Sequence, residues 1–219
     1  MIEAVIFDMD GLLVDSEPWW RVAETNVFGK LSKAPSEADF ERMMGNRIQE
    51  VIRQWYERHP WKNFDAEETR LMIVSEVRRL VTENAQLLPG VENCIRFFKE
   101  KKLPVVLASS SPLQLIEQLT KHYGIYDAFD AVFSAENEPY GKPHPAVFIT
   151  AADAIKTEAS HCLVFEDSFN GIIAAKAARM KCVAVPDAAY FHQTRFDCAD
   201  MKLHSLEAFD EEQWELISQ

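Results

Sequence analysis

The sequence predicts an α/β fold, a Rossmann-like doubly wound parallel sheet that carries an inserted α-helical cap domain. Over most of the chain, short apolar segments alternate with segments of helical pattern, which is typical of a parallel sheet covered by helices on both faces. Acidic, hydroxyl and lysine side chains follow several of the apolar segments. The 219 residues suffice for one core domain with a smaller insert.

The expected strands are apolar, often β-branched runs. They are EAVIFD near the start, LPVVLASS at 103–110, FDAVFSA at 129–135, CLVFED at 162–167 and KCVAVPD at 181–187. In the helical segment SPLQLIEQL, Ser111 and Gln114 fit a capping box, with Pro112 at the first helical position. Pro145 could open the helix AVFITAADAI in the same way.

The connection between the first two strands is unusually long. It spans about 90 residues, whereas a helical crossover needs only a dozen or more. The helix GVENCIRFFKEKK supplies that crossover, so the preceding residues are an insert that reads as helical throughout and shows no strand pattern. We therefore expect a catalytic core of residues 1–15 and 87–219 and a helical cap of residues 16–86, called the cap below.

Composition limits the partners of the chain. Hydrophobic residues make up 47%, charged residues 26%, and the formal net charge is -12. An acidic surface repels nucleic acid and anionic membranes, so we expect neither as a partner. No apolar run reaches the roughly 18 residues of a membrane span, and we expect a cytoplasmic monomer. The four cysteines form no CxxC pair and are expected to be free thiols.

Reactive side chains lie at four of the expected strand ends or in the loops that follow. They are Asp8 and Asp10, Ser109 and Ser110, Lys142, and Glu166 and Asp167. Each motif alone could be a turn, a helix cap or a surface charge. A doubly wound sheet, however, brings all four loops to one edge, where ligands bind. Together they predict a site for a divalent cation and a phosphate.

Phosphate monoesters require this combination, because their charge repels an attacking anion until their oxygens are neutralised. Carboxylates hold Mg²⁺, the cofactor we expect, with Mn²⁺ or Co²⁺ as substitutes. Lys142 and the amides near Ser111 would bind phosphate oxygens, and one carboxylate can attack phosphorus. Asp10, two residues after Asp8, can reach the leaving oxygen, and Gly11 allows a sharp turn.

The four motifs are DMDG, the serine after VVLA, the lysine of GKPHP and the acids of FEDSFNG. They resemble the four signature motifs of the haloacid dehalogenase superfamily, in order and across nearly the whole chain. The resemblance implies Asp8 as nucleophile and metal ligand, and Asp10 as general acid/base and ligand through its backbone carbonyl. The other roles that it implies are phosphate binding by Ser109 and Lys142, metal ligation by Asp167, and Glu166 as a second acidic ligand. The helical insert matches the first cap class of the superfamily.

Within this superfamily the dehalogenases lack a general acid at the place of Asp10, so its presence favours phosphoryl transfer. Four longer stretches look similar to hexitol and 2-deoxyglucose-6-phosphate phosphatases, namely LPGV, LASSSPLQ, YGKPHP and EDSFNGIIAAKAARM. We therefore expect hydrolysis of small sugar or sugar-alcohol phosphates through an aspartyl-phosphate. A β-phosphoglucomutase is the main alternative, although Ser16 and Trp20 stand where its motif would have threonine and histidine. Phosphoglycolate phosphatase is another, and a non-catalytic module is disfavoured because the reactive residues are present.

The cap should select the substrate by closing over the core. Gly45 and Asn46 interrupt a helical pattern, and Arg47 could extend from this loop to a sugar hydroxyl or phosphate, or equally be a surface charge. Glu17, Trp19 and Trp20 begin the cap near the nucleophile and could line the pocket, although Trp20 fits the cap core as well. The candidate substrate-binding residues are Ser109, Ser110, Lys142, Gly11, Arg47 and Glu17.

Overall fold

The computed structural model describes all 219 residues and contains one six-stranded sheet, in which every pair of neighbouring strands is parallel. The strand order is β3-β2-β1-β4-β5-β6. The strands are β1 (Ala4–Phe7), β2 (Val105–Ser109), β3 (Ala131–Ser134), β4 (Cys162–Glu166), β5 (Lys181–Ala184) and β6 (Met201–Lys202). The predicted doubly wound α/β fold is thus confirmed, and the two-residue strand β6 is the one that the sequence did not predict.

The central strand β1 is buried on both faces, which explains why its sequence is continuously apolar. Its alternate side chains enter two separate hydrophobic clusters. Val5 and Phe7 belong to the larger cluster, and Ala4 and Ile6 belong to the smaller one. Phe7 stacks on Phe165 of β4 with ring centroids 4.9 Å apart, and this contact fixes the two strands whose ends carry the acidic residues.

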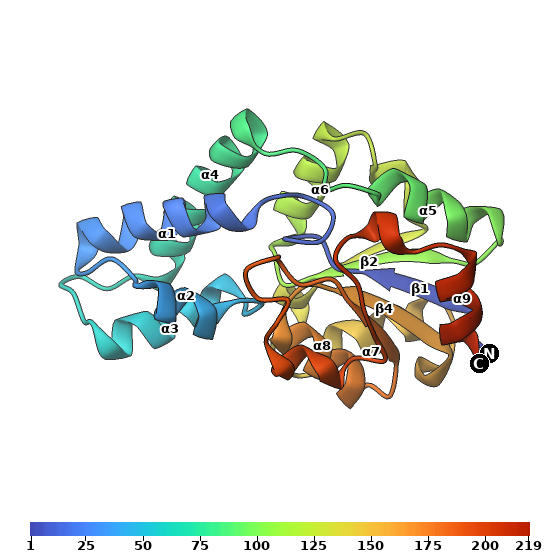
Figure 1. Cartoon of the computed structure of the whole chain (residues 1–219). Coiled ribbons are helices and arrows are strands. Elements are labelled where there is room, and N and C mark those ends of the chain that lie inside the picture. The colour runs from blue at the N-terminus through green and yellow to red at the C-terminus, as the bar shows by residue number, and fades with distance from the viewer.

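Helices cover both faces of the sheet, as Figure 1 shows. The face of the larger cluster is packed by α5 (Val91–Glu100), α6 (Leu113–His122) and α9 (Glu211–Ser218), and the opposite face by α7 (Ala146–Ala154) and α8 (Phe169–Ala177). Short 3₁₀ helices complete the core: η1 (Tyr126–Ala128), η2 (Ala135–Asn137), η3 (Ala159–His161), η4 (Thr194–Cys198) and η5 (Leu206–Ala208). No helix combines the length and apolar character needed to cross a membrane.

The segment between β1 and α5 forms four helices that stand together beyond the end of the sheet (Figure 1). They are α1 (Glu17–Leu31), α2 (Glu37–Met43), α3 (Ile48–Arg58) and α4 (Ala66–Asn84). Trp55 and Phe28 are fully buried among them, with ring centroids 5.7 Å apart. Gly45, at φ 78°, separates α2 from α3. This arrangement supports treating residues 16–86 as a cap on a core of residues 1–15 and 87–219.

The predicted capping box of α6 is wrong. The helix begins at Leu113 with Pro112 as its N-cap residue, and no side chain of the helix itself caps it. The backbone N–H of Leu113 donates instead to Glu136 Oε2, 2.7 Å away. The hydroxyl of Ser111 donates to Asp10 and accepts from no backbone N–H of the helix. All four cysteines are free, as predicted, and three of them are buried.

Candidate active site

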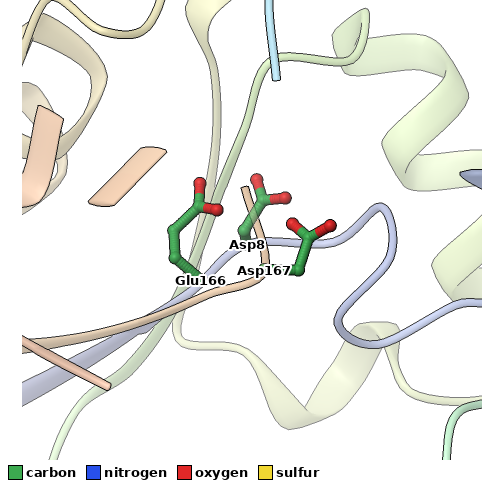
Figure 2. Close-up of side chains that lie close together, drawn as sticks. All are labelled: Asp8, Glu166 and Asp167. Carbon is green, nitrogen blue, oxygen red and sulfur yellow. The ribbon is translucent and has the colours of Figure 1, made fainter. Parts of the chain in front are cut away.

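Three buried carboxyl groups meet where β1 and β4 end. Asp8 directly follows β1, Glu166 is the last residue of β4, and Asp167 follows it. One oxygen from each carboxyl group lies within 4.8 Å of the others. Figure 2 shows the three groups side by side at the strand ends. Parallel pairing of β1 with β4 places them there, since Phe7 is in register with Phe165.

Lys142 supplies a positive charge to this group. It lies in the loop after β3, is 1% exposed, and its Nζ lies 2.8 Å from Asp8 Oδ1 and 2.6 Å from Glu166 Oε1. Burial alone would lower the pKa of Lys142, but the two carboxylates outweigh burial and raise the pKa above its usual value. Lys142 is therefore held as an ammonium ion against Asp8.

Glu166 is engaged through both carboxyl oxygens. Oε1 accepts from Lys142, and Oε2 accepts from the backbone N–H and the hydroxyl of Ser168, each 2.9 Å away. The start of α8 is shaped to fit this side chain, because a Cβ on Gly171 would lie 1.7 Å from Oε1. The contacts of Glu166 thus orient Lys142.

Asp167 differs because its buried carboxyl group accepts no hydrogen bond. Burial, followed by the charges of Glu166, Glu17 and Asp8, raises its pKa well above the usual value. The pKa of Asp8 is also raised, chiefly by burial and despite the ammonium of Lys142.

Three buried carboxyl groups thus face one ammonium ion. This deficit of positive charge, together with oxygen-only donors, fits a divalent cation at the group of Asp8, Glu166 and Asp167. Of the three, Glu166 already accepts hydrogen bonds through both oxygens, so Asp8 and Asp167 are the better candidate ligands. Gly11 leaves room for this arrangement. Its φ is 70°, and a Cβ there would lie 2.3 Å from Asp167 Oδ2. Gly11 therefore shapes the turn beside Asp167.

Asp10 has a different environment from Asp8, because four side chains donate to its carboxylate. The Ser16 hydroxyl and Trp20 Nε1 donate to Oδ1 over 2.7 and 2.9 Å. The hydroxyls of Ser111 and Ser109 donate to Oδ2 over 2.7 and 3.3 Å. One pair of donors begins the cap and the other follows β2, so both parts of the molecule fix Asp10. This role of Trp20 has no signal in the sequence, from which only a place in the pocket or in the cap core could be predicted.

The two serines that were predicted to bind phosphate or substrate make different contacts. Ser109 and Ser110 line the same cavity as Asp8 and Lys142. Ser109 also accepts from the backbone N–H of Ser111 over 3.1 Å. Ser110, in contrast, donates to the carbonyl of Gly45 in the cap over 2.7 Å, so this hydroxyl joins the core to the cap.

The structure places Arg47 away from the cavity, contrary to the expectation that it reaches the substrate. Its Nη1 donates to the carbonyls of Ala135 and Glu138, 3.0 and 2.7 Å away, and its Nη2 pairs with Glu50 Oε1 at 2.5 Å. Glu50 also accepts from the backbone N–H of Gly141 over 3.1 Å. Arg47 and Glu50 thus clamp the loop that precedes Lys142. The sequence alone could not predict these contacts, because the loop lies about 90 residues after Arg47 in the chain.

A cavity between the core and the cap connects these groups. Nineteen residues line it, among them Asp8, Asp10, Glu17, Trp20, Arg21, Glu24, Phe40, Met43, Ile48, Val51, Ser109, Lys142 and Asp167. Burial raises the pKa of Glu17 to about 7, and the charge of Asp10 adds to the effect. Burial, followed by the charge of Glu17, raises the pKa of Glu24 to about 8. Sequence reasoning selected Glu17 and missed Glu24, although the two lie two helical turns apart.

A doubly wound sheet with acidic groups and a buried lysine at its carboxyl edge, covered by a helical insert, defines a class of hydrolases with carboxylate-rich sites. The chain belongs to the haloacid dehalogenase-like hydrolase family, whose model matches residues 2–179. The superfamily resemblance predicted from the four motifs is thereby confirmed.

Known proteins similar to this chain include a curated phosphatase and several solved structures. Hexitol phosphatase B of Escherichia coli strain K12 is 42% identical over 206 residues, which cover 94% of this chain and 93% of the relative. The crystal structure of CbbY from Rhodobacter sphaeroides in complex with phosphate has a TM-score of 0.85 at 23% identity, covering 95% and 96% of the two chains. The β-phosphoglucomutase of Clostridium difficile has a TM-score of 0.82 at 25% identity, covering 100% and 98%.

Proposed function

We propose that this hydrolase is a Mg²⁺-dependent phosphatase that hydrolyses small sugar or sugar-alcohol phosphates through an aspartyl-phosphate on Asp8. The observation that carries the proposal is the asymmetry of Asp8. Lys142 holds its Oδ1, whereas Oδ2 accepts no hydrogen bond and is available to attack phosphorus. The similarity to hexitol phosphatase B supports the substrate class.

In the first step, Asp8 Oδ2 attacks phosphorus and the bond to the leaving oxygen breaks. Lys142 offsets the negative charge of the phosphoryl oxygens, and Glu166 keeps its ammonium in place. A bound Mg²⁺, with Asp8 and Asp167 as ligands, would neutralise further charge on the phosphoryl group. Ser109 offers its hydroxyl to the same cavity. Charge neutralisation matters most here, since both reactants are anions.

Asp10 serves as the proton carrier. It donates a proton to the departing alcohol oxygen, and in the second step it removes one from the water that hydrolyses the aspartyl-phosphate. The donors from Ser16, Trp20, Ser109 and Ser111 keep its carboxyl group in one orientation. Because two of them belong to the cap, we infer that Asp10 is positioned best when the cap is closed.

The cap, residues 16–86, excludes water and selects the substrate. Two sets of contacts support its closure over the core. Ser110 donates to Gly45, and Arg47 and Glu50 hold the loop before Lys142. We therefore assign Arg47 to cap closure instead of substrate binding. Glu17 remains the proposed contact to the substrate next to the phosphoryl group.

A mutase is the second candidate, because the β-phosphoglucomutase of Clostridium difficile shares the fold at 25% identity over the whole chain. A mutase would convert β-glucose 1-phosphate without net release of phosphate and would require glucose bisphosphate. The distinction lies in how well water reaches the aspartyl-phosphate.

The decisive test is phosphate release from hexose, hexitol and pentose phosphates, phosphoglycolate and nucleotides, with conversion of β-glucose 1-phosphate measured in parallel. We expect stoichiometric phosphate from a hexose or hexitol phosphate in Mg²⁺ buffer and no bisphosphate requirement. Isomerisation without free phosphate would contradict the proposal, and so would preference for phosphoglycolate.

A further inference from the structure

Glu24 is a buried carboxyl group that the proposed chemistry does not use. It lines the cavity, is only 7% exposed, and accepts no hydrogen bond from the protein. Glu17 lies seven residues earlier on the same face of α1 and also has no hydrogen-bond partner. The two carboxyl groups therefore form one wall of the cavity with unfilled acceptor positions.

The neighbouring cation does not fill these positions. Arg21 lies between the two glutamates in the sequence, but its Nη1 pairs with Glu37 Oε2 at 2.5 Å and its Nη2 donates to the Tyr190 hydroxyl over 2.8 Å. These contacts join α1 to α2 and to the loop after β5. Arg21 thus fixes the helix in place and leaves Glu24 free to accept from a ligand.

The opposite wall is apolar. It is formed by buried side chains of α2 and α3, namely Phe40, Met43, Ile48 and Val51. A cavity with carboxyl groups on one side and apolar side chains on the other is complementary to a polyol, whose hydroxyls can donate to carboxyl oxygens while its C–H groups contact the apolar side chains.

The position of Glu24 along α1 indicates which hydroxyls it meets. Glu17 lies beside the reacting groups, since a Cβ on Gly11 would be 2.3 Å from Asp167 Oδ2 and 3.1 Å from Glu17 Cγ. From there α1 runs away from the sheet (Figure 1). Two helical turns carry the chain about 10 Å, so Glu24 lies about that far into the cap.

A six-carbon polyol phosphate has roughly the matching length. An extended chain advances about 1.2 Å per bond, so the roughly eight bonds from phosphorus to the last hydroxyl of a hexitol phosphate span about 10 Å. The roughly five bonds of glycerol 3-phosphate span only about 6 Å. A hexitol can thus reach Glu24 and a triose cannot.

We propose that Glu24 is a specificity-determining residue that accepts hydrogen bonds from the distal hydroxyls of the substrate and so selects polyol phosphates of five or six carbons. This inference rests on the proposed phosphatase function and narrows its substrate class. Because Glu24 is remote from phosphorus, its hydrogen bonds are the same in the ground state and the transition state, and they lower KM without changing kcat.

The test measures kcat and KM for glycerol 3-phosphate, ribitol 5-phosphate, sorbitol 6-phosphate and an aryl phosphate. The proteins are the wild type, Glu24→Leu, Glu24→Gln and a control, Glu57→Gln, at an exposed position on α3. We expect Glu24→Leu to raise KM for sorbitol 6-phosphate about tenfold or more, because the hydrogen bonds between the distal hydroxyls and the Glu24 carboxyl group are lost. Glutamine keeps one acceptor and should raise KM about threefold. Values for glycerol 3-phosphate and the aryl phosphate should change less than about twofold.

The failures of the two proposals are distinguishable. No phosphate from any substrate, the aryl phosphate included, would overturn the phosphatase function. Turnover with a chain-length preference that is equal in wild type and both Glu24 variants would overturn only the role of Glu24. Should the leucine variant not fold, Glu24→Gln against Glu57→Gln decides the question. A preference for glucosamine 6-phosphate that depends on Glu24 would also refute hydroxyl recognition, since it would assign the wall to a cation.

Discussion

Replacing Glu24 with glutamine should stabilise the protein strongly at pH 8 and only weakly at pH 5. Burial and the charge of Glu17 raise the pKa of Glu24 to about 8, whereas a glutamate in the unfolded chain titrates near about 4.3. The folded state therefore favours the protonated carboxyl group. The contribution of the protonated Glu24 side chain to the free energy of unfolding is fully present below about pH 4. This contribution is lost as the pH rises through about 8.

The magnitude follows from the separation of the two pKa values. Relative to a group that does not ionise, Glu24 should cost the folded protein about 1 kcal/mol at pH 5 and roughly 4–5 kcal/mol at pH 8, since each pKa unit is worth about 1.4 kcal/mol. Glutamine has nearly the same shape and does not ionise, so it removes this cost. For a chain of this size we expect the melting temperature at pH 8 to rise by roughly 9–18 °C.

Thermal and urea unfolding at both pH values, with a chelator present, would measure the effect, and Glu57→Gln is the control. Glu17 also contributes to the pH dependence, with a pKa of about 7, but it is present in both proteins, so their difference isolates Glu24. Equal stabilisation at pH 5 and pH 8, or none at either, would refute the reasoning that burial holds this carboxyl group neutral.

Three further predictions concern the proposed chemistry. Asp8→Asn should abolish phosphate release from an aryl phosphate and leave the circular dichroism spectrum unchanged; residual turnover would remove Asp8 as nucleophile. Chelation should stop turnover and added Mg²⁺ should restore it, whereas metal-independent activity would exclude Asp167 as a ligand. Trp20→Phe removes one of the four donors to Asp10 and should lower kcat about tenfold with little change in KM, since one hydrogen bond to a charged group is lost. Unchanged kcat would show that Trp20 only packs.

Much of the fold could be predicted because its signals are local. A strand buried on both faces must be continuously apolar, and β1 and β4 meet that requirement in the sequence itself. The length of the first crossover revealed the helical insert. Strand β6 was missed because two residues carry too little pattern, and its pairing with β5 depends on the rest of the sheet.

The positions of the proposed reacting residues were predictable for a similar reason, whereas the positions of their hydrogen-bond partners were not. Asp8, Lys142 and Asp167 follow strands, and the parallel topology brings strand ends to one edge whatever the loops do. The partners of Asp10 and Arg47 come from the docking of the cap on the core, which no local pattern encodes. Ser111 illustrates the limit, because a serine before a helix normally caps it, and here its hydroxyl donates to a distant carboxylate and accepts from no backbone N–H of the helix.

The most direct test of the proposed mechanism is to trap the phosphorylated enzyme. The protein is mixed with a hexitol phosphate and Mg²⁺, quenched in acid within the first turnover, digested, and analysed by mass spectrometry. We predict one phosphoryl group on the peptide that contains Asp8, formed before free phosphate appears and absent from Asp8→Asn. A phosphoryl group on another residue, or phosphate release by the wild type with no phosphorylated peptide at any time, would contradict the mechanism.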